Sequence, residues 1–106
     1  MRFGDTIAHN RKQLGLTQKH LAEVVRKQDG EPITPQYLND IEHNRRTPSS
    51  PEIVEQLARA LKLQPEILYF KAGALPADLT SRNAISEDQI VAAFQAFREK
   101  LESKSS

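Results

Sequence analysis

The sequence predicts an all-α protein of five short helices followed by one additional C-terminal helix. Apolar residues recur at helical spacing along most of the chain, whereas no stretch shows the alternation of a half-buried strand. Pro, Gly and small polar residues separate these stretches at short intervals. Because a chain of 106 residues supports one modest core, we expect the helices to share it.

Two helices are expected before the first loop. The first covers residues 3–14 and ends at Gly15, a typical residue for closing a helix. The second covers residues 18–26 and begins behind Thr17, whose hydroxyl suits an N-cap. The apolar residues expected to face the core are Phe3, Ile7 and Leu14 in the first helix and Leu21, Ala22, Val24 and Val25 in the second.

A loop and a third helix follow. Asp-Gly and Pro are turn signals, so residues 27–32 are predicted to form a loop. Thr34 can cap the helix expected over 35–43, Pro35 suits its first position, and Asn44 can adopt the left-handed conformation that closes it. Its expected core residues are Leu38 and Ile41.

The second half of the chain contains three helical stretches. Residues 51–62 are expected to form a helix capped by Ser50, and residues 65–72 another that stops at Gly73. Residues 74–85 read as a loop with a short turn of helix. A capping box at Ser86-x-x-Gln89 begins the last helix, which continues to about residue 101.

These elements suggest three parts of the chain. Residues 1–73 form the first domain, residues 74–102 form an extension with a dimerisation helix, and residues 103–106 form a disordered tail.

Composition excludes several classes of function. The chain has no cysteine, so disulfides, thiolate metal sites and cysteine nucleophiles are excluded. The three histidines have no metal-ligand spacing, and no catalytic constellation or phosphate loop is present, so we expect no enzyme, no cofactor and no metal. Without a signal peptide or a membrane-length apolar run, a cytoplasmic protein is expected. The net charge of +1 gives no argument for nucleic acid by itself.

A motif in the first half carries the functional prediction. Residues 3–63 resemble the Cro/phage-repressor-like (XRE) helix-turn-helix family, in the order that the family shows. The matching residues are Arg11, Gly15-Leu16-Thr17-Gln18, Leu21-Ala22-Glu23, Ile33-Thr34-Pro35-Gln36-Tyr37-Leu38-Asn39-Asp40-Ile41-Glu42, Arg45-Arg46, Pro48-Ser49 and Leu57-Ala58-Arg59-Ala60-Leu61. The resemblance implies a repressor-like fold and a bacterial or phage transcription regulator associated with the nucleoid.

The outward face of the third helix contains the candidate base contacts. Gln and Asn pair bidentately with adenine in the major groove, so Gln36 and Asn39 are expected to read bases. Asp40 can accept from cytosine or exclude wrong sequences, and Tyr37 can reach a phosphate or a sugar. An ordinary solvated face is the alternative. The candidate DNA-binding residues of this segment are Thr34, Gln36, Tyr37, Asn39 and Asp40.

Three further residues are candidates for phosphate contact. Gln18 lies at a helix start, where free backbone N–H groups suit a phosphate, and the family uses this glutamine in that way. The alternative is that Thr17-Gln18 only caps the helix. Arg45 and Arg46 lie in the loop after the third helix and are expected to contact phosphates, which positions a protein without reading sequence.

The resemblance also implies one structural ion pair and two departures from the family. Arg11 and Glu42 correspond to a buried pair that ties the first helix to the third. The turn over residues 26–32 is longer than in most relatives, so it either reaches DNA through Arg26 and Lys27 or changes how the third helix docks. Pro35 stands where many relatives have a polar base-reading residue.

The last helix predicts a homodimer. Its apolar residues are spaced four, three and four apart, which is the narrow seam of packed helices, and Tyr69 and Phe70 are candidates to pack against it. The alternative is that the helix folds back on its own domain. The candidate interface residues are Ile90, Phe94, Phe97 and Leu101.

The leading interpretation is therefore a homodimeric, sequence-specific transcription regulator, a repressor or an activator with repression favoured, that binds a double-stranded DNA operator. A second interpretation is an antitoxin-like or regulatory module of the same fold that mainly binds a protein partner. DNA affinity that depends on salt distinguishes the two.

Overall fold

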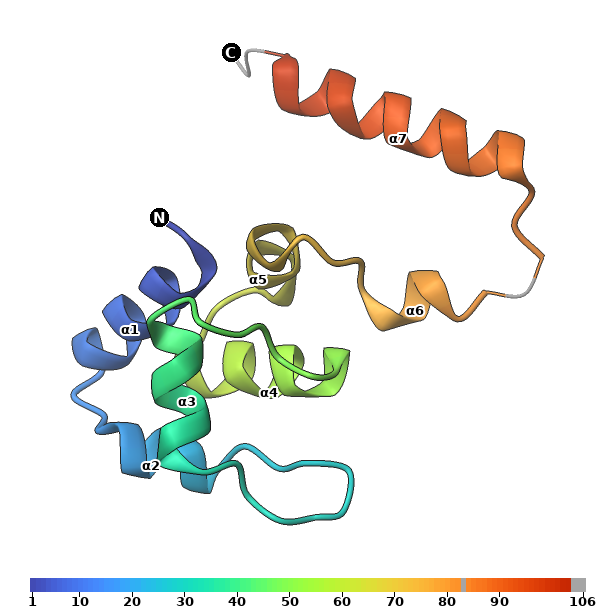
Figure 1. Ribbon diagram of the computed structural model, residues 1–106. Helices are drawn as coiled ribbons and strands as arrows, with labels where there is room; N and C mark the ends of the chain where they lie inside the picture. Colours follow the sequence, from blue (N-terminus) through green and yellow to red (C-terminus); the bar gives the residue numbers. More distant parts are fainter. Residues whose placement is uncertain (83, 104–106) are drawn as a thin grey trace.

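A computed structural model describes residues 1–82 and 84–103, and all regular elements within them are helices (Figure 1). In chain order they are α1 (Phe3–Gln13), α2 (Gln18–Glu23), α3 (Pro35–Glu42), α4 (Pro51–Leu61), α5 (Pro65–Ala72), α6 (Ala77–Thr80) and α7 (Glu87–Glu102). The all-α prediction of five helices and a C-terminal helix is confirmed, and α6 is the short helical turn expected within 74–85. No described helix has both the length and the apolar character that crossing a membrane requires.

Helices α1–α5 enclose one core. Helix α1 packs against α3, α4 and α5, while α2 packs on α3 and α4 on α5. The largest fully buried side chains come from all five helices and from the segment after α2: Ile7, Leu21, Val25, Leu38, Ile41, Ile53, Leu57 and Leu68. Two expected core residues are not in it: Leu14 lies beyond the end of α1, and Val24 lies beyond the end of α2 and is 59% exposed.

Helices α1 and α3 cross in close contact at Gly4. A Cβ atom at this position would collide with the carbonyl oxygens of Ile41 and Glu42. The Gly4 N–H donates to Asn44 Oδ1 at 2.9 Å, and Asn44 adopts the left-handed conformation with φ of 60°. The turn that closes α3 therefore also binds the start of α1.

Helix starts follow the capping signals with one exception. Thr17 and Thr34 accept from the backbone N–H groups of His20 and Tyr37, at 3.0 Å each. Ser86 and Gln89 form a complete capping box at the start of α7. Ser50 occupies the N-cap position of α4, but its side chain makes no capping hydrogen bond.

The long turn between α2 and α3 is a small hairpin rather than an irregular loop. Helix α2 ends at Glu23, three residues earlier than expected, because Val25 to Ile33 pair instead: the Ile33 N–H donates to the Val25 carbonyl at 2.9 Å, and a β-bridge joins Arg26 to Pro32. Gln56 of α4 then accepts from the Arg26 N–H at 2.7 Å and donates to its carbonyl at 2.8 Å. The insertion is thus tied to α4.

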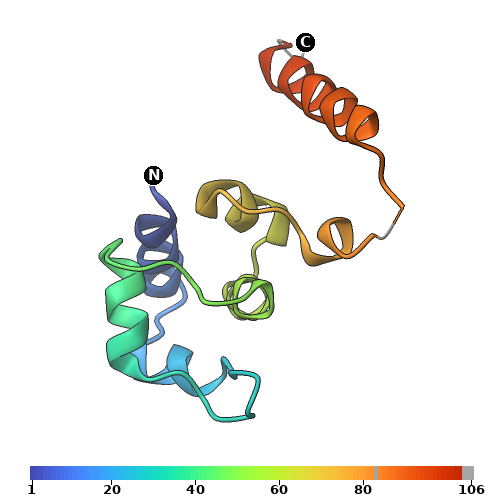
Figure 2. The same ribbon diagram turned by 45° about the vertical axis from the view of Figure 1, so that its right-hand side comes forward.

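Helix α7 stands apart from the five-helix body in both views (Figures 1 and 2). None of its residues is buried, and its aromatic contact with the body joins Phe97 to Phe70, with ring centroids 6.1 Å apart. Tyr69, the other candidate to pack against α7, lies in the core instead, where its hydroxyl donates to Glu55 Oε1 at 3.0 Å. Burial, together with this hydrogen bond, raises the pKa of Tyr69 to about 12.

Of the tail expected over 103–106, Ser103 is the C-terminal cap of α7, and residues 104–106 lie outside the described part.

The α1–α3 crossing predicts a steric limit at Gly4. Gly4→Ala adds a methyl group where backbone oxygens leave no room, so we expect a loss of about 1–3 kcal/mol in the free energy of unfolding. Thermal and denaturant unfolding measure it. Gln13→Ala, at an exposed position of α1, is the matched control and should leave stability nearly unchanged. Equal melting temperatures for the two variants would contradict the close crossing.

Candidate nucleic-acid interface

One face of α3 presents polar side chains to solvent while the other closes the core. Leu38, Ile41 and Glu42 are buried, so the other positions of the helix point outward or sideways. Thr34 and Gln36 are exposed, and Tyr37, Asn39 and Asp40 are partly buried. Five of the sequence-predicted residues therefore remain at least partly open to solvent on α3 and at its N-cap, and they form the polar surface of this helix.

Beneath this surface, Arg11 of α1 and Glu42 of α3 form a buried ion pair. Arg11 Nε and Nη2 donate to Glu42 Oε2 and Oε1 at 2.6 and 2.9 Å, in the bidentate geometry that guanidinium and carboxylate favour. Their side chains are 10% and 3% exposed. Arg11 Nη1 also donates to the Leu16 carbonyl at 2.8 Å. One arginine thus connects α1, the turn before α2, and α3.

Gln18, the first residue of α2, extends this pair to the surface. Its Nε2 donates to Glu42 Oε1 at 3.0 Å and to Asn39 Oδ1 at 3.1 Å. The side chain of Gln18 is therefore bound to two residues of α3, whereas the sequence indicated only capping or a phosphate contact for it. No sequence signal identifies this link, because 21 residues separate Gln18 from Asn39.

A second polar cluster is centred on Asp40. Gln36 Nε2 and Arg45 Nε both donate to Asp40 Oδ1, at 3.0 and 3.2 Å. Asp40 therefore makes an ion pair at the surface, and Arg45 neutralises its charge. This pairing joins two residues that the sequence assigned to separate roles, one to bases and one to phosphates.

A third contact orders the loop after α3. The guanidinium of Arg46 lies 4.5 Å from the centre of the Tyr37 ring, which is a cation–π arrangement. The Tyr37 hydroxyl accepts from the Ser49 N–H at 2.8 Å. Tyr37 thus supports the basic loop from below, and Arg46 remains exposed. The Thr34 hydroxyl is likewise engaged, since it caps α3.

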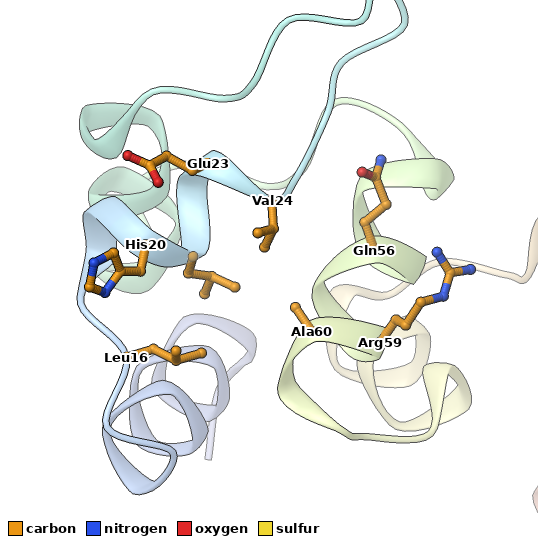
Figure 3. Close-up of a pocket in the computed structure, with 8 residues that line it drawn as sticks. Leu16, His20, Glu23, Val24, Gln56, Arg59 and Ala60 are labelled. Atoms are coloured by element: carbon orange, nitrogen blue, oxygen red, sulfur yellow. The ribbon is translucent and has the colours of Figure 1, made fainter.

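A separate groove lies between α2 and α4 (Figure 3). It is open, has a volume of about 550 Å³, and has an apolar floor that includes Leu16, Val24 and Ala60. His20 and Glu23 of α2 line one side of it, and Gln56 and Arg59 of α4 line the other. None of the residues predicted to contact DNA lines this groove.

Comparison with known proteins gives a consistent result. A helix-turn-helix family model (HTH_3) matches residues 7–68, which include the whole polar surface. Two curated proteins, from two strains of Mycobacterium tuberculosis, are each 34% identical over 90 residues and are named uncharacterized HTH-type transcriptional regulators. Each match covers 83% of this chain but 59% of the relative, so this chain spans less than two thirds of the relatives' length.

Solved structures share the architecture. SinR, described as the master regulator for biofilm formation and crystallised in complex with DNA, is 29% identical, with a TM-score of 0.52 over 62% of this chain and 95% of that chain. ClgR, the clp gene regulator from Corynebacterium glutamicum, is 21% identical, with a TM-score of 0.53 over 93% of this chain and 84% of its own. A complex of SinR and SinI gives 23% identity, a TM-score of 0.53, and coverage of 92% and 98%. The latter two support the fold alone.

The buried ion pair predicts that replacing Glu42 destabilises the protein much more than replacing Asp40, the other acidic residue of α3. Glu42→Ala leaves Arg11 charged and without its partner in the interior, so we expect a loss of about 3–5 kcal/mol in the free energy of unfolding. Asp40→Ala removes a surface pair and should cost at most about 1 kcal/mol. Denaturant unfolding of both variants checks this. A Glu42→Ala protein as stable as Asp40→Ala would show that the pair contributes little.

Proposed function

Because this chain belongs to the helix-turn-helix family (HTH_3), the family of the Cro/phage-repressor-like (XRE) proteins, we propose that it is a sequence-specific DNA-binding transcription regulator rather than an enzyme. The observation that carries the proposal is the polar face of α3, which a helix-turn-helix places in the major groove. The 29% identical SinR chain crystallised in complex with DNA supports the same interpretation. Such a role places the protein with bacterial or phage DNA in the cytoplasm.

We assign separate roles in DNA binding to these residues from their exposure and charge. Gln36 and Asn39 read base edges, because amide side chains can donate and accept in the groove. Arg46, and Arg45 beside its partner Asp40, contact phosphates and set the position of the helix. Pairing with Arg45 also reduces the repulsion that Asp40 would otherwise exert on the DNA backbone. Thr34, Tyr37 and Gln18 support this surface by holding α3 and the basic loop in place.

Two substitutions separate base reading from phosphate contact. Gln36→Ala should lower the preference for the selected base pair by about 1–3 kcal/mol, whereas Arg46→Ala should weaken specific and random DNA alike. Selection from random duplexes followed by titration at several salt concentrations measures both. Each phosphate contact contributes about −0.9 to the slope of log affinity against log salt, so Arg46→Ala should make the slope shallower.

The proposal fails if no sequence is enriched and the protein does not bind DNA at low salt. If Gln36→Ala instead weakens all sequences equally, then Gln36 belongs with the backbone contacts.

We further propose that the protein acts as a homodimer through α7. Ile90, Phe94, Phe97 and Leu101 lie on one side of α7 and are between 44% and 60% exposed. Phe70 of α5, 60% exposed, continues this apolar surface, and contiguous apolar surface of this kind marks an interface. A twofold axis through it allows two α3 helices to read half-sites about 34 Å apart.

The proposed outcome of dimer binding is repression, since a dimer bound over a promoter excludes other proteins from it. A reporter gene behind the selected operator tests whether the protein represses or activates transcription. Expression should fall when the protein is supplied, and a rise would identify an activator.

A protein-interaction module, antitoxin-like or regulatory, is the second candidate. The exposed apolar face of α7 and the open groove between α2 and α4 are the observations that favour it. Protein binding without salt-dependent DNA affinity would establish this alternative in place of the first.

The dimer proposal predicts the effect of charges on α7. Phe94→Asp combined with Phe97→Asp should give a folded monomer with much weaker operator binding, because the interface would have to bury two carboxylates. Sedimentation at micromolar concentration measures the oligomeric state. The control is Ala92→Asp combined with Gln95→Asp, which adds the same charge to the opposite side of α7. A dimer that survives the Phe94 and Phe97 changes would place the interface elsewhere.

A further inference from the structure

The buried ion pair dictates the direction of a chain of hydrogen bonds that ends at the DNA-facing surface. Glu42, paired with Arg11, is a carboxylate, and both of its oxygens can only accept. Glu42 Oε1 lies 3.0 Å from the side-chain amide of Gln18. The amide nitrogen of Gln18, rather than its oxygen, must therefore face Glu42.

The same nitrogen determines how Asn39 is turned. Gln18 Nε2 carries two hydrogens, and the second is directed at Asn39, 3.1 Å away. Only the oxygen of the Asn39 amide can accept this hydrogen. If Asn39 were rotated by 180°, two NH₂ groups would face each other and the hydrogen bond would be lost. The Asn39 NH₂ group is consequently directed away from Gln18, and no acceptor binds it among the described residues.

Gln36 is held in a different way. Its amide nitrogen also faces a carboxylate, that of Asp40, but this pair lies at the surface and Arg45 shares the same oxygen. The network at Asn39 begins instead at an ion pair whose acidic side chain is 3% exposed. Of the two amides proposed to read bases, only that of Asn39 has its orientation set from the core.

We propose that Asn39 reads a purine through its N7 atom, and that Gln18 is the positioning residue that enforces this choice. The inference rests on the proposed DNA-reading role of α3. An outward NH₂ group needs an acceptor, and N7 is the major-groove acceptor that adenine and guanine share. Cytosine presents its own amino group, which would face the amide NH₂, and the O4 atom of thymine is flanked by a methyl group.

The test begins by locating the base pair that Asn39 contacts. Selection from random duplexes with the full chain and with Asn39→Ala identifies the position whose preference is lost. Each base pair contains one purine, and the purine of this pair is the base that Asn39 is expected to contact. Replacing it by the 7-deaza analogue, which has C–H in place of N7, should weaken binding by the wild-type chain by roughly 3- to 10-fold, the equivalent of one neutral hydrogen bond. Binding by Asn39→Ala should not change.

Gln18→Met then tests the positioning role. Methionine has nearly the same length but cannot donate, so the Asn39 amide becomes free to turn its oxygen toward the groove, where it can accept from the amino group of cytosine. The preference for the selected base pair over a pair that presents a cytosine amino group to residue 39 should therefore shrink although Asn39 is still present. Gln13→Met makes the same chemical change at an exposed position of α1 and should keep the full base-pair preference. Thermal unfolding verifies that both variants fold, and Gln18→Ala replaces Gln18→Met if the latter does not.

The outcomes separate this inference from the function on which it rests. An equal 7-deaza penalty for the wild-type chain and Asn39→Ala, or an unchanged base-pair preference in Gln18→Met, would overturn the inference while specific DNA binding stands. If the wild-type chain selects no sequence at all, the proposed function itself is overturned, and the inference with it.

Discussion

The ion pair between Arg11 and Glu42 is the interaction on which the rest of the domain depends. Charges taken out of water are costly unless they are paired and their remaining hydrogen-bonding atoms are satisfied. Here the guanidinium binds both carboxylate oxygens and a backbone carbonyl, so three segments can close only in one arrangement. The pair therefore specifies the position of α3 relative to α1 and α2, and α3 carries the polar surface.

The polar surface consists of parts with different degrees of order. Asn39 is connected to the core through Gln18, whereas Gln36, Asp40 and Arg45 form a cluster that solvent reaches. The Arg46 guanidinium rests on the Tyr37 ring. Pre-arranged groups lose less conformational entropy when a partner binds, while exposed charged groups contribute mainly through long-range attraction and depend on salt. One helix and its following loop thus combine an amide held from the core with exposed charged side chains; in the proposed function the first reads a base and the others contact phosphates.

The five-helix body and α7 present opposite packing situations. The body buries its apolar residues around Leu57 and Ile41, and even its long insertion is bound to α4 by Gln56. Helix α7 keeps an apolar side in solvent and meets the body at the Phe70–Phe97 contact. In the proposed homodimer, a second copy covers this exposed side.

Local chemistry in the sequence determined the elements of this protein. Thr17 and Thr34 begin helices because a hydroxyl can satisfy free N–H groups, Asn44 and Gly73 end helical segments because they tolerate a positive φ, and helical spacing assigned most of the core. Family resemblance added the Arg11–Glu42 pair. All of these depend on neighbours along the chain or on a pattern already known.

Tertiary structure alone decided which polar groups meet. Gln18 joins Asn39 across 21 residues, Gln56 binds the hairpin across 30, and Val24 turns to the surface where the periodicity of α2 placed it in the core. Tyr69 and Phe70 are adjacent in sequence, yet one is buried beside Glu55 and the other faces α7. A side-chain amide or aromatic ring has no local preference for such distant partners. Their contacts follow from the helix crossings, which the whole core sets together.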